Sequence, residues 1–251
     1  MLKRRIIPIE LLDQGRLVKS VRFGAPRDVG NPIKSSQVYS DQDADELVIL
    51  NIDRSNRSIS SLVEVVKLVS RECFVPLSSG GGISCLKDAK DLFVAGTDKV
   101  VINSSAYTET NIIHEITQQY GRQAVIVAID VRFQDGKFSL YSNCGKILEK
   151  TSLVQHIENV IRHGAGEIMI QSIDKDGSMS GYDLNLIEKV ISLSSVPVIA
   201  VGGAGDFMHL KQVFDLGVDA AACGSLFNFG DNNPLRAKAF LKNYNIPLKK
   251  M

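Results

Sequence analysis

An internal repeat constrains the fold of this chain more than any other feature of its sequence. The sequence matches itself without a gap from Glu46 through Ser104 when it is shifted by about 121 residues. A match of this length indicates two similar halves, which is the pattern of a repeat architecture. The aligned positions include Glu46 with Glu167, Ile52-Asp53 with Ile173-Asp174, Val75-Pro76 with Val196-Pro197, Gly81-Gly82 with Gly202-Gly203, Phe93 with Phe214, Gly96 with Gly217, Asp98 with Asp219, and Ser104 with Ser225.

Eight short β-branched runs alternate with longer segments in which apolar residues recur three and four positions apart. Eight strand–helix units in 251 residues fit a (β/α)8 barrel, although an open doubly wound sheet has the same periodicity. Two similar four-unit halves favour the closed barrel. We therefore expect an α/β fold, a single (β/α)8 TIM barrel with half-barrels at approximately 1–122 and 123–251. The expected strands are Arg5–Ile9, Glu46–Ile52, Phe74–Ser79, Lys99–Asn103, Ala124–Asp130, Glu167–Ser172, Val196–Val201 and Ala220–Cys223.

Charge and composition exclude several classes of function. The 29 Lys and Arg residues balance 28 Asp and Glu residues, so the basic excess typical of nucleic-acid or membrane-surface proteins is absent. No apolar run approaches the roughly 18 residues of a transmembrane helix, and the basic start of the chain lacks a secretory pattern. The four cysteines are scattered and the four histidines fall in helical patterns, so we expect no metal site, no disulfide and no cofactor. A cytoplasmic protein is the expectation.

Two glycine-rich segments follow the third and seventh expected strands, where a barrel of this class carries its active site. Residues without a Cβ let backbone N–H groups approach an anion, and serines at the following helix starts complete such a site. Glycines of this kind also make plain tight turns, but their recurrence in the repeat favours two phosphate sites and a ligand with a phosphate at each end. We name as the first cradle Gly81, Gly82, Asn103 and Ser104, and as the second cradle Gly177, Gly202, Gly203, Gly224 and Ser225.

Two carboxylates occur at expected strand ends. Asp130 closes the fifth strand and Asp176 lies just beyond the sixth, so both are candidates for general acid–base catalysis. Either could instead cap a loop, as Asp53 and its repeat partner Asp174 could.

The sequence as a whole resembles the cyclase subunit family of imidazole glycerol phosphate synthase, the synthase half of a glutamine amidotransferase. This resemblance implies a lyase-type enzyme subunit that binds a bisphosphorylated ribulosyl intermediate and receives ammonia from a separate glutaminase. It further implies that Asp130 is one of two acid–base aspartates and that Lys19 is a mobile cation over the active site. The residues that carry it include Arg5-Ile-Ile-Pro, Gly15-Arg-Leu-Val-Lys, Gly80-Gly-Gly-Ile, Val127-Ala-Ile-Asp, Asp174-Lys-Asp-Gly-Ser and Gly202-Gly-Ala-Gly.

The first aspartate of that family pattern is missing. The family has Cys-Leu-Asp where this chain has Ile9-Glu10-Leu11, and the repeat pairs Asp130 with Ile9 or, after a two-residue slip, with Leu11. Neither side chain can transfer a proton, and strand alternation turns Glu10 to the other face. Asp13 is a further candidate for a replacement acid. The family also has an Asp at the position of Asn51.

A subgroup of the family shares the leucine at this position and serves surface-polysaccharide pathways, where ammonia converts an N-acetyl group into an acetamidino group. The chain resembles this subgroup through Val21-Arg22-Phe23 and Ser180-Gly-Tyr-Asp183. The main expectation is therefore an amidotransferase synthase subunit for an acetamidino sugar. The alternatives are the histidine-pathway cyclase–lyase, which forms imidazole glycerol phosphate and AICAR, and a non-catalytic conduit that passes ammonia to a third, amidating enzyme.

The resemblance also implies a gate for ammonia at the start of the strands. We name as the charged ring Arg5, Glu46, Lys99 and Glu167. Such a ring could also be purely stabilising. No cysteine lies in a Gly-x-Cys-x-Gly elbow, so the glutaminase is expected to be a second polypeptide in a heterodimer.

Overall fold

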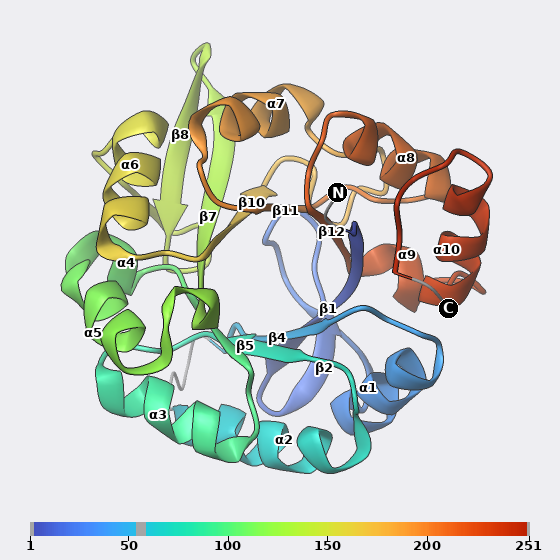
Figure 1. Ribbon diagram of the computed structural model, residues 1–251, viewed down its shortest axis with the longest axis horizontal. Coiled ribbons are helices and arrows are strands. Elements are labelled where there is room, and N and C mark those ends of the chain that lie inside the picture. The colour runs from blue at the N-terminus through green and yellow to red at the C-terminus, as the bar shows by residue number, and fades with distance from the viewer. Residues whose placement is uncertain (1–2, 54–58, 250–251) are drawn as a thin grey trace.

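Eight parallel strands form a closed barrel at the centre of the molecule, surrounded by helices (Figure 1). The computed structural model describes residues 3–53 and 59–249. Neighbouring barrel strands pair in parallel in the order of the chain, β7 with β10 included, and the pairing of β12 with β1 closes the circle. The expected (β/α)8 barrel is thereby confirmed. Its strands are β1 (Arg5–Asp13), β4 (Leu47–Asn51), β5 (Leu77–Gly80), β6 (Lys99–Ile102), β7 (Val125–Gln134), β10 (Glu167–Ser172), β11 (Val198–Val201) and β12 (Ala220–Cys223).

The repeat found in the sequence is visible in the positions of the strands. Strand β5 recurs 121 residues later as β11, and β6 recurs at the same spacing as β12. The expected bounds of β10 and β12 are confirmed, whereas β5 and β11 begin two or three residues later than expected. The late starts follow from Pro76 and Pro197, which lack the N–H that a central strand donates.

Ten helices among the described residues cover the outside of the barrel. Their buried faces carry the apolar residues that recur at helical spacing, such as Leu62, Val66 and Val69 of α2. Side chains at the N-caps fix several helix starts, with Ser152 before α6 and Asp206 before α8. The helices are α1 (Pro32–Asp41), α2 (Ile59–Glu72), α3 (Leu86–Ala95), α4 (Ser105–Thr108), α5 (Asn111–Tyr120), α6 (Leu153–His163), α7 (Leu184–Leu193), α8 (Phe207–Asp215), α9 (Ser225–Asn228) and α10 (Pro234–Lys242), with a 3-10 turn at Arg122–Ala124.

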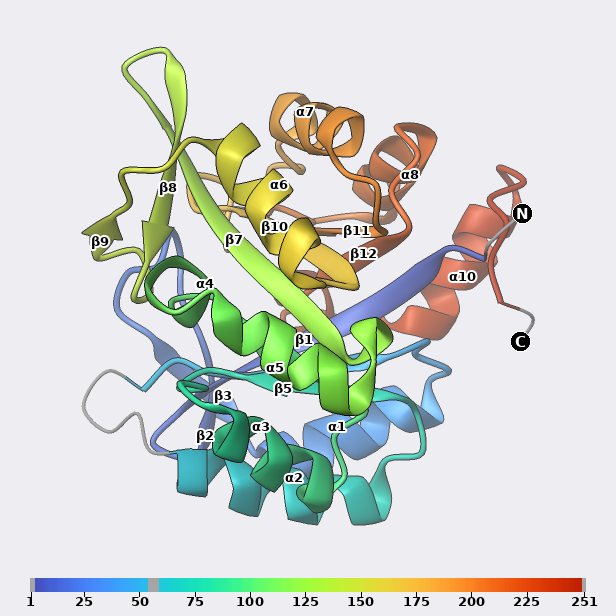
Figure 2. The same ribbon diagram turned by 60° about the vertical axis from the view of Figure 1, so that its left-hand side comes forward.

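Two barrel strands continue into antiparallel hairpins that the sequence analysis did not anticipate. Strand β1 turns back into β2 (Arg16–Lys19), which pairs with β3 (Arg27–Gly30), and β7 turns back into β8 (Lys137–Ser142), which pairs with β9 (Ile147–Leu148). Figure 2 shows the β7–β8 hairpin projecting beyond the helices. Both turns have two central residues with positive φ, Gln14-Gly15 and Asp135-Gly136, as type I′ turns require.

The interior of the barrel is an apolar column separate from the layer between strands and helices. It contains eleven buried residues, among them Ile7, Val101, Met169 and Ile199. Leu50, near the carboxyl end of β4, packs against it.

Outside the barrel, the buried ammonium group of Lys238 on α10 lies 2.8 Å from Asp43 and 2.8 Å from Asp45, which precede β4. This contact ties the last helix to the first units of the barrel. None of the helices described is long and apolar enough to cross a membrane.

Candidate active site

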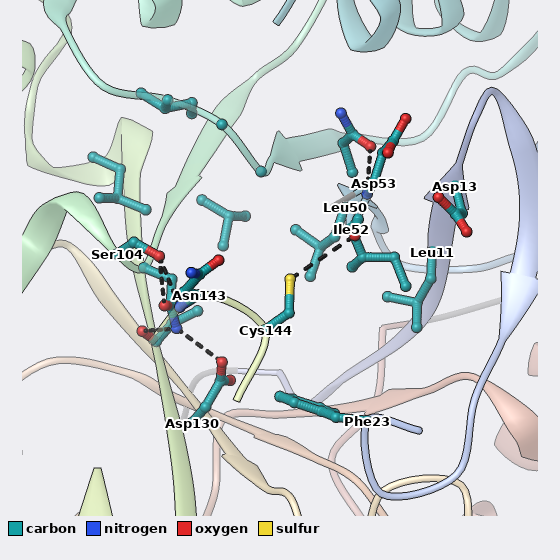
Figure 3. Close-up of a pocket in the computed structure, with 18 of the residues that line it drawn as sticks. Leu11, Asp13, Phe23, Leu50, Ile52, Asp53, Ser104, Asp130, Asn143 and Cys144 are labelled. Carbon is teal, nitrogen blue, oxygen red and sulfur yellow. Dashed lines mark hydrogen bonds between the residues drawn. The ribbon is translucent and has the colours of Figure 1, made fainter. Parts of the chain in front are cut away.

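A cavity of about 620 Å³ opens at the carboxyl ends of the barrel strands, which we call the mouth. It brings Asp130 together with all four residues of the first cradle. Leu11, Leu50 and Cys144 also line it, and Figure 3 shows Leu11 and Asp130 on opposite sides with Cys144 between them. The cavity is large enough for a small phosphorylated ligand.

Asp130 is buried at the floor of this cavity. Asn103 Nδ2 donates to Asp130 Oδ2 at 3.1 Å and to the Ala128 carbonyl at 3.1 Å. Burial, with a smaller contribution from the nearby Asp176, raises the pKa of Asp130 to about 7, against the opposing effect of the Asn103 bond. A carboxyl group with this pKa both accepts and donates protons near neutral pH.

The first cradle is built by backbone that only glycine tolerates. Gly81 and Gly82 have φ of 96° and 94°, and a Cβ on Gly81 would overlap the Asn51 carbonyl. Ser104 precedes α4, and its hydroxyl accepts a hydrogen bond from the Asn143 backbone N–H at 3.1 Å. The predicted residues of this cradle therefore share one wall of the cavity.

The second cradle lines a smaller, adjoining pocket at the mouth. Gly177, Gly202, Gly203, Gly224 and Ser225 all line it. Gly203 has a φ of 108°, and a Cβ there would overlap the Gly181 carbonyl. Leu11, Ser20 and Gln171 border both pockets, so the two cradles adjoin one continuous mouth.

Lys19 lies in the second cradle rather than in an open loop over the mouth. It is the last residue of β2, only 4% exposed, and its Nζ donates to the Ile9 carbonyl at 2.6 Å. A Cβ on Gly224 would overlap this ammonium group, so glycine makes room for it. Burial lowers the pKa of Lys19 to about 8, although the charges of Glu10, Asp176 and Cys223 oppose that effect.

Asp176 connects the two pockets through Gln171. Gln171 lies opposite Asp130 in the β7–β10 ladder, and its Nε2 donates to Asp176 Oδ1 at 3.2 Å. Burial raises the pKa of Asp176, against a hydrogen bond from the Phe23 N–H and the charge of Lys19. Asp174 lies outside this group, where its carboxylate accepts from the Phe133 N–H at 2.8 Å.

Leu11 occupies the place on β1 that Asp130 occupies on β7. Leu11 lies opposite Leu50 in the β1–β4 ladder, and Asp130 lies opposite Gln171, which stands 121 residues beyond Leu50. Leu11, and not Ile9, is therefore the repeat partner of Asp130. Glu10 points to the helical layer, as strand alternation predicted, where Ser36 donates to it at 2.9 Å. Asp13 and Asn51 both line the cavity.

The charged ring closes the opposite end of the barrel. Arg5 lies 2.6 Å from Glu46 and 2.5 Å from Glu167, and Lys99 lies 3.1 Å and 2.5 Å from the same two carboxylates. Burial by itself would raise the pKa of Glu167, but the hydrogen bond and charge of Arg5, together with Lys99, hold it below its usual value. All four predicted residues meet in one ion-pair network at the base of the apolar column.

Sequence reasoning missed several residues at the mouth. Gln171 borders both pockets, and Asn143 and Cys144 reach the cavity from the loop between β8 and β9. Asn143 and Cys144 both have a φ of 54°, in the left-handed region that non-glycine residues rarely adopt. The Asp135-Gly136 turn was the available signal, because Asp-Gly between alternating apolar residues is typical of a hairpin. The four cysteines, Cys144 included, are free thiols.

Comparison with known proteins assigns this barrel to a family. The family model described as "Histidine biosynthesis protein" matches residues 5–233, which include both cradles, Asp130 and the charged ring. The chain belongs to the histidine biosynthesis protein family.

Curated members of the family match this chain over nearly its full length. Three of them carry the name imidazole glycerol phosphate synthase subunit HisF. The protein of Chloroherpeton thalassium is 41% identical, with 99% of this chain and 100% of the relative covered. Those of Exiguobacterium sp. and Bacillus cereus are 39% and 38% identical, with 99% of this chain and 97% and 100% of the relative covered. The resemblance to the cyclase subunit family is thereby confirmed. None of these names supports the closer relationship to the polysaccharide subgroup.

Proposed function

We propose that this chain is the synthase subunit of a glutamine amidotransferase of the imidazole glycerol phosphate synthase type, a cyclase–lyase subunit that pairs with a separate glutaminase. The observation that carries the proposal is the placement of two anion cradles at one mouth, on either side of Asp130 and Gln171. Such a mouth fits an elongated ligand with a phosphate at each end. The names of the full-length relatives favour the histidine pathway over the acetamidino-sugar pathway as its setting.

The ligand is held by its two phosphates. At the first cradle the Gly82 N–H and the Ser104 hydroxyl donate to one phosphate, and at the second cradle the Gly203 N–H and the Ser225 hydroxyl donate to the other. The Lys19 ammonium adds a positive charge to the second cradle only. This asymmetry orients the ligand, because its two ends meet different charges.

Ammonia reaches the mouth from the opposite end. The glutaminase docks on the face that carries the charged ring, and ammonia passes the ring and the apolar column of the barrel. Neutral ammonia can enter an apolar interior, whereas burial of an unpaired ammonium ion is strongly unfavourable. The column ends beside Leu50 and Ala128, close to Asp130.

Asp130 moves protons during ring closure and bond cleavage at the ligand, and Gln171 and Asp176 position the adjoining part of the mouth. Leu11 cannot share this work, so the family's second acid–base group is absent from its usual position. Asp13 lines the same cavity and is our candidate for the acid that acts instead.

A second candidate function follows from Leu11. A mouth that keeps both cradles but replaces an acid–base aspartate by leucine suits a different ammonia acceptor, as in acetamidino-group formation, or a conduit that serves a third, amidating enzyme. The half-barrels at approximately 1–122 and 123–251 are proposed as the repeated units in either case.

The experiment that separates these functions supplies the purified chain with ammonium salt and the bisphosphorylated ribulosyl intermediate of the histidine pathway. Formation of imidazole glycerol phosphate above the rate of the Asp130→Asn variant supports the first proposal. Absence of turnover together with tight ligand binding supports the second. Growth of a strain lacking its histidine cyclase, when this chain is expressed in it, gives an independent measurement.

A further inference from the structure

Glu10 is an ionisable residue buried in the wall of the barrel, outside the mouth. Its side chain is fully buried and accepts a hydrogen bond from Ser36 Oγ on α1 at 2.9 Å. The Ser35 side chain also favours the charged form of this carboxylate. Both serines are neutral hydroxyl donors, and Lys19 is the positive charge that acts on the buried carboxylate.

The strand register brings Glu10 next to Lys19. Leu11 lies opposite Val18 and Leu12 opposite Leu17 in the antiparallel β1–β2 ladder, so Glu10 and Lys19 both lie one residue beyond the Leu11–Val18 pair that ends this ladder. Lys19 in turn fixes its ammonium group on the Ile9 carbonyl, one residue from Glu10 on the same strand.

We infer that Glu10 is a positioning residue, which keeps the Lys19 ammonium charged and held at the second cradle without itself touching the ligand. This inference rests on the proposed function of the second cradle as a phosphate site. Glu10 therefore does not supply the acid–base group that is missing at the position of Leu11. It serves the binding of the ligand instead.

The surrounding charges agree with this role. Burial raises the pKa of Glu10 to about 7, against hydrogen bonds from Ser35 and Ser36 and the charge of Lys19. Lys19 has a pKa of about 8 and faces the carboxyl groups of Glu10 and Asp176 and the thiol of Cys223, whose own pKa burial raises to about 12. Glu10 therefore ionises at a lower pH than that at which Lys19 loses its proton, which allows both to be charged near neutral pH. Tyr39 and Cys73 also lie within reach of the Glu10 charge.

The direct test is the pKa of Lys19, measured by NMR of 13C-labelled lysine side chains in the full chain. In Glu10→Gln this pKa is expected to fall by about one unit, because the buried ammonium loses its counter-charge. Glu64→Gln, a change of the same chemistry on the exposed face of α2, is the matched control and leaves it unchanged. An unchanged Lys19 pKa in a folded Glu10→Gln chain overturns the inference, whatever the protein binds.

Ser36→Ala provides a second variant if Glu10→Gln fails to fold. Loss of the Ser36 donor makes the Glu10 carboxylate harder to ionise, so the Lys19 pKa falls by a smaller amount. A Lys19 pKa that does not fall in Ser36→Ala counts against the inference in the same way.

The ligand-binding consequence is measured with inorganic sulfate, followed at the Ser225 and Ser104 backbone amides. For a one-unit fall in the Lys19 pKa, Glu10→Gln weakens sulfate binding at Ser225 about fivefold at pH 8 and hardly at pH 6. Binding at Ser104 stays unchanged and serves as the internal control. A wild-type chain that binds sulfate at neither cradle contradicts the proposed function, whereas equal binding at Ser225 in both chains at pH 8 contradicts only the role of Glu10.

Discussion

Leu11 and Asp130 face the same cavity from equivalent positions on β1 and β7, the first and fifth strands of the barrel. One position therefore keeps a carboxylate whose pKa is about 7, and the other presents a leucine. The rest of the mouth keeps its polar groups, including both cradles and Lys19. Leu11 therefore leaves the position equivalent to Asp130 without a group that can transfer a proton.

Leu11→Asp is expected to increase ammonium-dependent formation of imidazole glycerol phosphate by about 10²–10⁴-fold, because it adds the missing member of an acid–base pair. Steady-state kinetics with the bisphosphorylated ribulosyl intermediate measure the effect. Leu50→Asp is the matched control, since it places a carboxylate on the neighbouring strand of the same cavity and should give no increase. If the unmodified chain is already fast and Asp13→Asn abolishes its activity, Asp13 is the second acid and the expectation for Leu11 is wrong.

Asp130→Asn is expected to abolish turnover and yet to stabilise the fold above neutral pH. The folded-state pKa of Asp130 is raised to about 7, so the folded chain holds a proton that the unfolded chain releases near pH 4. The unfolding free energy of the wild type therefore falls, relative to the variant, by about 2–4 kcal/mol between pH 4 and pH 8. Urea denaturation of both chains at several pH values measures this difference. A constant difference would show that Asp130 titrates normally.

Ser225→Ala is expected to weaken anion binding at the second cradle about tenfold or more, because a charge-assisted hydrogen bond contributes about 1.5–3 kcal/mol. Ser104→Ala should have the same effect at the first cradle only. Titration with inorganic phosphate, followed at the amides of Gly82 and Gly203, distinguishes the two sites. Loss of binding at both sites from either single change would contradict two independent cradles.

Glu167→Gln is expected to lower the unfolding free energy by about 2 kcal/mol or more, since it leaves Arg5 and Lys99 to share Glu46 alone. Combining it with Lys99→Met should recover part of that loss, because the charges of the ring balance again. Chemical denaturation of the single and double variants measures both effects. An unchanged unfolding free energy in Glu167→Gln would show that the ring contributes no stability and would leave the passage of ammonia as its role.

The purified chain alone is expected to show no glutamine hydrolysis, and it should bind a glutaminase through the face that carries the charged ring. Cross-linking of the native complex followed by mass spectrometry locates the docked face. Cross-links near Arg5 and Lys99 support the routing of ammonia along the barrel. Cross-links confined to the β7–β8 hairpin at the mouth would contradict it.

The repeat in the sequence was sufficient to predict the barrel, because a match such as Gly81-Gly82 with Gly202-Gly203 fixes both the order of the strands and the faces they share. The repeat also predicted that the two cradles would lie at one mouth, whereas the meeting of the charged ring was implied by the family resemblance. Strand alternation correctly turned Glu10 away from the mouth.

The hairpins and the position of Lys19 could not be obtained from periodicity. Strand β2 is only four residues long, which is too short for an alternating pattern to stand out, and its partner β3 is polar and exposed. The location of Lys19 depends on the space that Gly224 leaves open more than 200 residues away. Contacts of that kind follow from packing between distant segments, and the local pattern carries no trace of them.

Lys238 has a consequence for how the protein is made. Its salt bridges to Asp43 and Asp45 join α10 to the beginning of the barrel, and β12 forms the ladder with β1 that completes the circle. A chain leaving the ribosome can therefore fold its early units only as an open, partly paired sheet, with β1 exposed along one edge. Closure waits for segments that are synthesised some two hundred residues later, and such non-local pairing is slow. During that interval the unpaired edge of β1 can pair with other chains, and a chaperone that covers this edge would protect the nascent chain from aggregation.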